Sequence, residues 1–114
     1  MEQCLFCKIA SGKIPSDKVF EDSDLFAFRD INPQAPSHIV VVPKKHIATI
    51  NDMAEGDSCL FGKVMLAIKK IAAKEGISSG GYRVVINCNS DAGQTVFHVH
   101  FHLLGGRKLQ WPPG

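Results

Sequence analysis

The chain is 114 residues long, which is enough for one domain around a single hydrophobic core. Hydrophobic residues make up 45% of it and charged residues 21%, a composition that excludes disordered and fibrous proteins. The formal net charge is only +2 and the basic residues are scattered, so we expect no nucleic-acid partner. Because no stretch is long enough to span a membrane and the first residues lack the pattern of a secretory signal, we expect a cytoplasmic protein, with the nucleus also open to it and no membrane partner.

The predicted elements, taken in chain order, form an α+β fold. A short helix over residues 5–12 stops at Gly12, and a hairpin follows with strands at 19–20 and 25–29 around a turn at 21–24. A loop with two prolines, residues 30–37, leads into a strand at 38–43. Apolar side chains at helical spacing predict a helix over residues 57–74 with Gly76 as its C-cap, and strands at 81–89 and 96–106 flank a turn at 90–94. We predict one domain over residues 1–114, in which one long helix and a short N-terminal helix accompany an antiparallel meander-like sheet of about five strands.

The last predicted strand contains three histidines that alternate with apolar residues, in the stretch "VFHVHFHLLGG". Neighbouring side chains of a strand point to opposite faces of the sheet. The apolar side chains therefore point one way and the histidines the other: Phe97, Val99, Phe101 and Leu103 against His98, His100 and His102. Ordinary surface composition does not explain three consecutive histidines on one face, so we interpret them as functional.

These histidines suit a phosphate group better than a metal ion. Same-face residues are about 6.7 Å apart along a strand, so one strand cannot bring three imidazoles to one zinc ion. Neutral imidazole is a nucleophile near pH 7, and its attack on phosphorus gives a covalent intermediate that water can hydrolyse. A second, protonated histidine can donate to the phosphoryl oxygens or to the leaving group.

The turn before this strand, "DAGQT", predicts a place for the phosphate. Gly93 allows close approach to the backbone, and successive N–H groups can form an anion nest that the Gln94 amide and the Thr95 hydroxyl assist. The sequence contains no Walker A motif, no dinucleotide fingerprint and no carboxylate cluster for magnesium. We therefore expect catalysis to require no metal or other cofactor.

The stretch "GQTVFHVHFHLLGG" resembles the His-x-His-x-His signature of the histidine triad (HIT) superfamily, in which x is apolar. The resemblance extends over almost the whole chain, through "FCKIASGKIPS", "FEDSDLFAFRDINPQAPSHIVVVPKKHI" and "GYRVVINCNSDAG". "DINPQAPSH" and the final "WPPG" resemble the HINT branch, the histidine triad nucleotide-binding proteins. The resemblance implies a HIT fold and a homodimeric purine nucleoside phosphoramidase. Such an enzyme hydrolyses the P–N bonds of adenosine 5′-monophosphoramidates, and also aminoacyl-adenylates, to AMP through a nucleotidyl-histidine intermediate.

The resemblance also implies roles for the histidines. His100 matches the nucleophile that becomes adenylylated, and His102 matches the histidine that contacts the phosphate and assists the leaving group. His98 matches the histidine that supports His100 from behind. His38 matches a further histidine near the triad, for which a buried, hydrogen-bonded structural role is implied.

The implied substrate contacts come from three parts of the chain. Asp30 matches a ribose-binding acid and Ile31 its base-contacting neighbour. The C-terminal tail, residues 107–114, is implied to cross a dimer interface, where Trp111 shapes the partner's pocket. Thr95 stands where the HINT branch commonly has serine, and the hydroxyl is kept. The matching phosphate-side contacts are Asn87, Gly93, Gln94 and Thr95.

The stretch "CLFC" raises a separate question of metal binding. By spacing alone Cys4 and Cys7 form half of a zinc site, and free thiols are the alternative. In relatives that keep both cysteines, the resemblance implies that the other ligands of a structural zinc ion are the residues matching His46 and His98. A thioredoxin-like redox role lacks the βαβ context that it needs.

Other functions stay open at this point. A dinucleoside polyphosphate hydrolase would use the same histidines, whereas nucleotidyltransferases of this superfamily usually have glutamine at the position of His102. A nucleotide-binding regulatory or scaffold protein with incidental hydrolysis is the alternative outside enzymes, and a zinc-storage or redox protein would depend on Cys4 and Cys7 instead.

Overall fold

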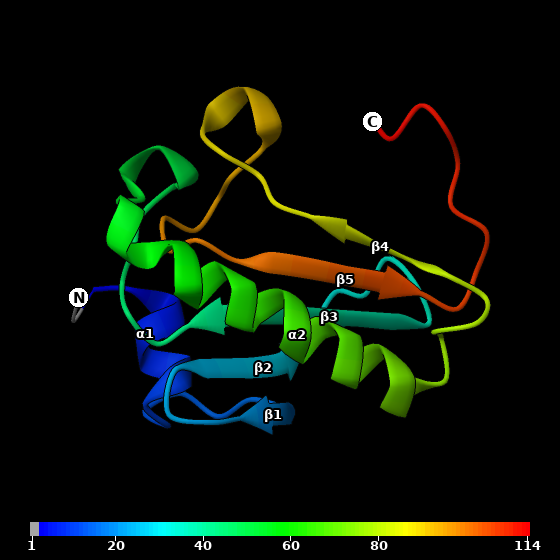
Figure 1. Cartoon of the computed structure of the whole chain (residues 1–114), viewed down its shortest axis with the longest axis horizontal. Helices are drawn as coiled ribbons and strands as arrows, with labels where there is room; N and C mark the ends of the chain where they lie inside the picture. The colour runs from blue at the N-terminus through cyan, green and yellow to red at the C-terminus, as the bar shows by residue number, and fades with distance from the viewer. Residues whose placement is uncertain (1–2) are drawn as a thin grey trace.

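The structure, a computed structural model that describes residues 3–114, has the predicted order of elements (Figure 1). Each element lies within about five residues of its predicted range. Short 3₁₀ turns at Ile50–Asp52, Glu55–Asp57 and Ser90–Ala92 complete it. The helices and strands are α1 (Leu5–Ala10), β1 (Lys18–Glu21), β2 (Leu25–Arg29), β3 (Ser37–Pro43), α2 (Ser58–Glu75), β4 (Tyr82–Val85) and β5 (Phe101–Gly105).

The five strands form one antiparallel sheet in the order β1-β2-β3-β5-β4. The predicted α+β class is confirmed, and the meander holds for β1, β2 and β3. The chain then crosses the sheet through α2 to the far edge, where β4 lies, and β5 returns to the gap between β3 and β4 (Figure 1). β5 is therefore central, and the histidines that precede and enter it lie in the middle of the molecule.

The histidine segment is less regular than the alternation predicts. β5 begins only at Phe101, so His98 and His100 precede the strand, and Phe97 is half exposed where a buried position was expected. The register Val41↔Phe101 would place Pro43 opposite Val99. Proline has no N–H to donate, so the ladder ends there. The Val99 N–H donates instead to the Ile47 carbonyl at 2.7 Å. The strand predicted at 81–89 likewise ends at Val85, beside His102.

The two faces of the sheet are covered differently. Alternate residues of β3 point to opposite faces, Ile39 and Val41 to the α2 side and Val40 and Val42 to the α1 side, so the whole strand is buried. α2 covers the first face along its length, while α1 covers only one end of the second (Figure 1). His38 and His102 lie on this second face, beyond the reach of α1. Within residues 3–114, no helix has the length and hydropathy needed to cross a membrane.

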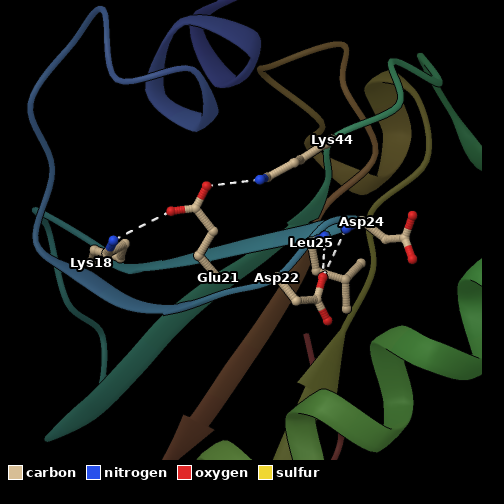
Figure 2. A network of polar contacts seen from close by, with 6 residues as sticks. All are labelled: Lys18, Glu21, Asp22, Asp24, Leu25 and Lys44. Atoms are coloured by element: carbon tan, nitrogen blue, oxygen red, sulfur yellow. Dashed lines mark hydrogen bonds and ion pairs between the residues drawn. The ribbon is translucent and has the colours of Figure 1, made fainter.

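Polar contacts define the β1–β2 hairpin and its neighbours (Figure 2). The Asp22 carboxylate accepts the backbone N–H groups of Asp24 and Leu25, both at 2.8 Å, and so closes the turn. Glu21 pairs with Lys18 at 3.3 Å and with Lys44, just past β3, at 2.7 Å. These pairs lie at the surface, so each contributes little to the free energy of unfolding.

Two glycines, Gly105 of β5 and Gly62 of α2, differ in the space around them, and Gly105 packs against Ile77, just past the C-cap of α2. A Cβ at Gly105 would lie 2.7 Å from Ile77 Cδ1, whereas a Cβ at Gly62, on the exposed side of α2, would meet nothing within 4 Å. Gly105→Ala should lower the free energy of unfolding by about 1–3 kcal/mol through overpacking. Gly62→Ala should raise it by about 0.5–1 kcal/mol, because alanine loses less backbone entropy in a helix. Urea denaturation of both variants checks this, and a stable Gly105→Ala protein would contradict the packing described.

Candidate functional site

A cavity of about 650 Å³ opens on the face of the sheet opposite α2. This volume suits a mononucleotide-sized ligand. Its lining includes the polar side chains of His100, His102, Asn87 and Thr95. It also includes an apolar wall, which is formed by Leu5, Phe6, Ile9, Ile14, Pro15 and Phe28.

The structure brings most of the predicted substrate contacts together at this cavity. Its lining includes seven of them: Asp30, Ile31, Asn87, Gly93, Thr95, His100 and His102. Gln94 and Trp111 are not among the lining residues. Trp111 is 80% exposed, and Arg83 lies 6.0 Å from its ring centre. Its implied role is in a partner's pocket, so that role stays a prediction.

The Gln94 side chain is hydrogen-bonded inside its own loop, and the phosphate contact implied for this residue stays a prediction. Its side chain is buried and donates to the carbonyls of Ala48 at 2.8 Å and Val96 at 3.1 Å. Its Oε1 accepts the Asn89 N–H at 2.8 Å, and its own N–H donates to the Asn89 carbonyl. The N–H of Gly93 is also used inside the loop, where it donates to the Ser90 carbonyl. The predicted anion nest therefore lacks these two donors, and Gly93 contributes an open edge to the cavity.

His100 is held in one tautomer by the backbone. Its Nδ1 lies 2.8 Å from the carbonyl oxygen of His98. A carbonyl only accepts, so the proton of neutral His100 is on Nδ1 and its Nε2 carries the lone pair. The ring packs edge-on against Phe6, with a centroid distance of 4.9 Å. His100 therefore has the geometry of an oriented nucleophile.

His102 belongs to a chain of three polar groups. The Gln34 backbone N–H donates to His38 Nδ1 at 3.0 Å, so the proton of neutral His38 is on Nε2. This Nε2 lies 2.9 Å from His102 Nδ1 and 3.4 Å from the Asp30 carboxylate. His38 therefore donates to His102, which leaves the proton of His102 on Nε2. The resemblance implied a buried, hydrogen-bonded His38 near the triad, and the structure adds its partner, His102, through a contact that is diagonal across the register of β3 and β5.

Burial keeps the imidazoles of the site neutral. It lowers the pKa of His38 and of His100, and in both cases the nearby Asp30 carboxylate opposes the shift. Burial, with added repulsion from His100 and His38, lowers the pKa of His102 to about 4. In the free protein near pH 7 the site therefore contains uncharged rings, which suits a nucleophile.

His98 lies behind the cavity, in a cluster with Cys4, Cys7 and His46. The four donor atoms lie within 4.8 Å of one another. His98 Nδ1 is 3.3 Å from Cys4 Sγ and 3.2 Å from His46 Nδ1, and Cys7 Sγ is 3.5 Å from both imidazoles. Tetrahedral zinc with Zn–N of about 2.0–2.1 Å and Zn–S of about 2.3 Å would space its ligands by about 3.3–3.8 Å.

The tautomer of His98 also fits a metal ligand. Its Nε2 is 2.7 Å from the Pro43 carbonyl and so carries the proton, which leaves a lone pair on Nδ1, facing the thiols. Without a metal, burial and the neighbouring Cys4 raise the pKa of the Cys7 thiol. This donor set can hold a closed zinc site, with no open position for a substrate.

Sequence reasoning missed the apolar wall of the cavity. Leu5, Phe6 and Ile9 come from α1, and Phe28 comes from β2. In the sequence they are ordinary hydrophobic residues of a short helix and a buried strand. The only available signal was the position of two of them inside "CLFC", next to the candidate ligands.

Comparisons with known proteins all find HIT proteins. A family model described as the HIT domain matches residues 11–109. The purine nucleoside phosphoramidase of Escherichia coli (strain K12) is 46% identical over 95% of this chain and 91% of its own length. An uncharacterized HIT-like protein of Synechococcus elongatus is 50% identical over 99% of this chain and 98% of its own. A crystal structure of a HIT family hydrolase from Legionella pneumophila Philadelphia 1 superimposes with a TM-score of 0.97 at 58% identity, covering 98% of this chain and 100% of that one.

The low pKa of His102 makes stability depend on pH. In the unfolded chain this group titrates near its ordinary 6.5, and in the folded protein at about 4. Between these values only the unfolded state binds the proton, so stability falls as the pH falls from about 6.5 to 4. Between pH 7 and 4.5 the wild type should lose about 2 kcal/mol more than His102→Gln, as measured by urea denaturation at both pH values. Equal losses would mean that His102 is not neutral in the folded state.

Proposed function

The chain belongs to the HIT family, and from this premise we propose that it is a purine nucleoside phosphoramidase. Its substrates would be adenosine 5′-monophosphoramidates and, by the same nucleophile, aminoacyl-adenylates. The observation that carries the proposal is His100, whose Nδ1 is bound to a carbonyl while its ring lines the cavity. The name of the relative from Escherichia coli and the hydrolase name of the Legionella structure support it.

The cavity supports one orientation of the nucleotide. The phosphorus lies at His100, where Asn87 and Thr95 are close to its oxygens. The Asp30 carboxylate, which also lines the cavity, accepts hydrogen bonds from the ribose hydroxyls. The base then packs against the apolar wall, where burial of its faces contributes to affinity.

The reaction proceeds in two balanced steps. In the first, His100 Nε2 forms a bond to phosphorus while the bond from phosphorus to the amine nitrogen breaks, and the amine takes up one proton. In the second, water forms a bond to phosphorus while the bond from phosphorus to His100 Nε2 breaks, and one proton is released. The sum is phosphoramidate plus water giving AMP plus amine. Throughout, the Nδ1–H of His100 donates to the His98 carbonyl oxygen, which stabilises the positive charge of the intermediate.

His102 and His38 transfer the proton in this proposal. In the free protein both rings are neutral, but the negative charge of a bound phosphate raises their pKa values. The pair then binds a proton, which it donates to the leaving amine in the first step. In the second step it takes a proton from the attacking water. Asp30, 3.4 Å from His38, balances the added charge.

We further propose a structural zinc ion at Cys4, Cys7, His46 and His98. The support is the donor set, its spacing and the tautomer of His98. Bound there, zinc would crosslink the N-terminal segment to the histidine segment and leave the reaction to the imidazoles. Catalysis would need no other cofactor.

We also propose a homodimer, because the sheet ends in an edge strand that a second copy can reach. β4 is an edge strand, and the C-terminal tail lies beside it, where Arg83 donates to the Gln110 carbonyl at 2.9 Å. An open edge can pair with a second copy of itself. In that arrangement Trp111, exposed in one protomer, would reach the partner's cavity.

Replacing the nucleophile tests the proposed activity. His100→Ala should lower single-turnover hydrolysis of adenosine 5′-phosphoramidate by more than about 10⁴-fold. The acid-labile AMP adduct that can be trapped on the wild type should be absent. Cys59→Ser, at an exposed position away from the cavity, is the matched control. Full activity of His100→Ala would overturn the assignment, faster cleavage of a dinucleoside polyphosphate would indicate that hydrolase class, and AMP binding without hydrolysis would indicate a nucleotide-binding protein.

Metal analysis tests the proposed zinc site. The wild type purified with zinc in the medium should contain about one zinc ion per chain, and Cys4→Ser/Cys7→Ser should contain none. Cys59→Ser/Cys88→Ser should keep the zinc, because these two cysteines lie outside the cluster. Atomic emission spectrometry measures the content. A wild type that stays free of zinc, or a Cys4→Ser/Cys7→Ser protein that retains it, would contradict the site.

A further inference from the structure

Helix α1 joins the two sites of the protein. Its N-cap residue is Cys4 and its third residue is Cys7, so the cysteine–histidine cluster holds the N-terminal end of the helix. Leu5, Phe6 and Ile9, from the same six residues, form part of the apolar wall of the cavity. The cluster and the cavity are thus contacted by neighbouring side chains of one helical turn.

Such a short helix depends on its anchors. A helix of six residues is unstable by itself in water, since helices shorter than about 12 residues are marginal even in good helix-forming sequences. The Cys4 sulfur accepts the Cys7 N–H at 3.4 Å and lies 3.3 Å from His98. Cys7 lies 3.5 Å from both His46 and His98. These contacts tie the first turn of α1 to two segments that are far away in the sequence.

The wall that α1 forms is close to the reacting group. Phe6 packs edge-on against His100 at 4.9 Å and against Phe28 at 5.6 Å. Leu5 is 43% exposed and Phe6 is 7% exposed, so α1 presents an accessible apolar surface beside a buried ring. A small rotation of α1 would move this surface relative to His100.

We propose that Cys4 and Cys7 are positioning residues for the nucleotide base: with His46 and His98 they clasp α1 so that Leu5 and Phe6 form the base-binding wall. This inference rests on the proposed nucleotide function, and it concerns the affinity of the cavity for the base. Zinc in the cluster would tighten this clasp, and its loss would weaken binding of the base.

The effect should be confined to the base. The phosphate and ribose contacts, Asn87, Thr95, His102 and Asp30, come from segments other than α1. His98, which orients His100 through its carbonyl, is fully buried and keeps its 2.7 Å hydrogen bond to Pro43. Loss of the clasp should therefore raise KM, and any fall in kcat through the contact of Phe6 with His100 should be smaller than the rise in KM.

Binding of AMP and of ribose 5-phosphate, which lacks the base, tests this. Cys4→Ser/Cys7→Ser should bind AMP about tenfold more weakly than the zinc-loaded wild type, and ribose 5-phosphate equally well within about twofold. Titration calorimetry for AMP and ligand-detected NMR for ribose 5-phosphate measure the Kd values. Cys59→Ser/Cys88→Ser is the matched control and should bind both as the wild type does. The wild type itself should lose AMP affinity when a chelator removes zinc, and regain it when zinc is restored.

The outcomes separate this inference from the proposed function. If the wild type binds AMP no more tightly than ribose 5-phosphate, the nucleotide function itself fails. If Cys4→Ser/Cys7→Ser binds AMP like the wild type, or loses both ligands equally, the clasp is overturned. Retained binding of ribose 5-phosphate shows that the variant is folded.

Leu5→Ala provides a second route that leaves the cysteines in place. It should weaken AMP binding in the zinc-loaded protein and have little further effect in Cys4→Ser/Cys7→Ser, because the wall is already displaced there. Additive losses in the triple variant would show that Leu5 and the cluster act independently, which would overturn the proposal.

Discussion

The 2.7 Å hydrogen bond between His98 Nε2 and the Pro43 carbonyl fixes the side chain that lies between the cysteine–histidine cluster and the cavity. It places the proton of His98 on one nitrogen and aims the other at Cys4, Cys7 and His46. The carbonyl of the same residue holds Nδ1 of His100. One buried imidazole therefore connects the end of β3, the N-terminal helix and the ring that faces the cavity. Pro43 contributes twice, because its missing N–H ends the β3–β5 ladder and its carbonyl is then free to accept.

The site obtains its reactivity from desolvation and from fixed tautomers. Burial lowers the pKa values of His38, His100 and His102, so the rings are neutral where an exposed histidine would be partly charged. Backbone groups then decide which nitrogen of His100 and of His38 carries the proton. Both effects need a rigid surrounding, which the central position of β5 and the packing of Phe6 against His100 supply. The chemistry of the cavity thus follows from the packing of the sheet around it.

The same elements both stabilise the fold and line the cavity. Its histidines come from β5 and the segment before it, and much of its apolar wall comes from α1 and β2. α1 is too short to hold its place alone, so the cysteine–histidine cluster and the apolar contacts of Phe6 and Ile9 hold it. A group that stabilises the N-terminal segment therefore also shapes a ligand-binding wall.

The sequence by itself determined the elements and the chemistry that depends on local pattern. Helical spacing predicted α2 and its Gly76 cap, and alternation predicted that Phe101 and Leu103 face the core with His102 on the opposite side. Only the tertiary structure decided the contacts between distant segments. It places β5 beside β3 and α1 along the cavity. It also pairs His38 with His102 and directs the Gln94 side chain to the Ala48 carbonyl. The physical reason is that periodicity reports which face a side chain takes within its own element. Hydrogen-bond partners and pocket walls depend on which elements meet, and that is decided by burial of the whole chain.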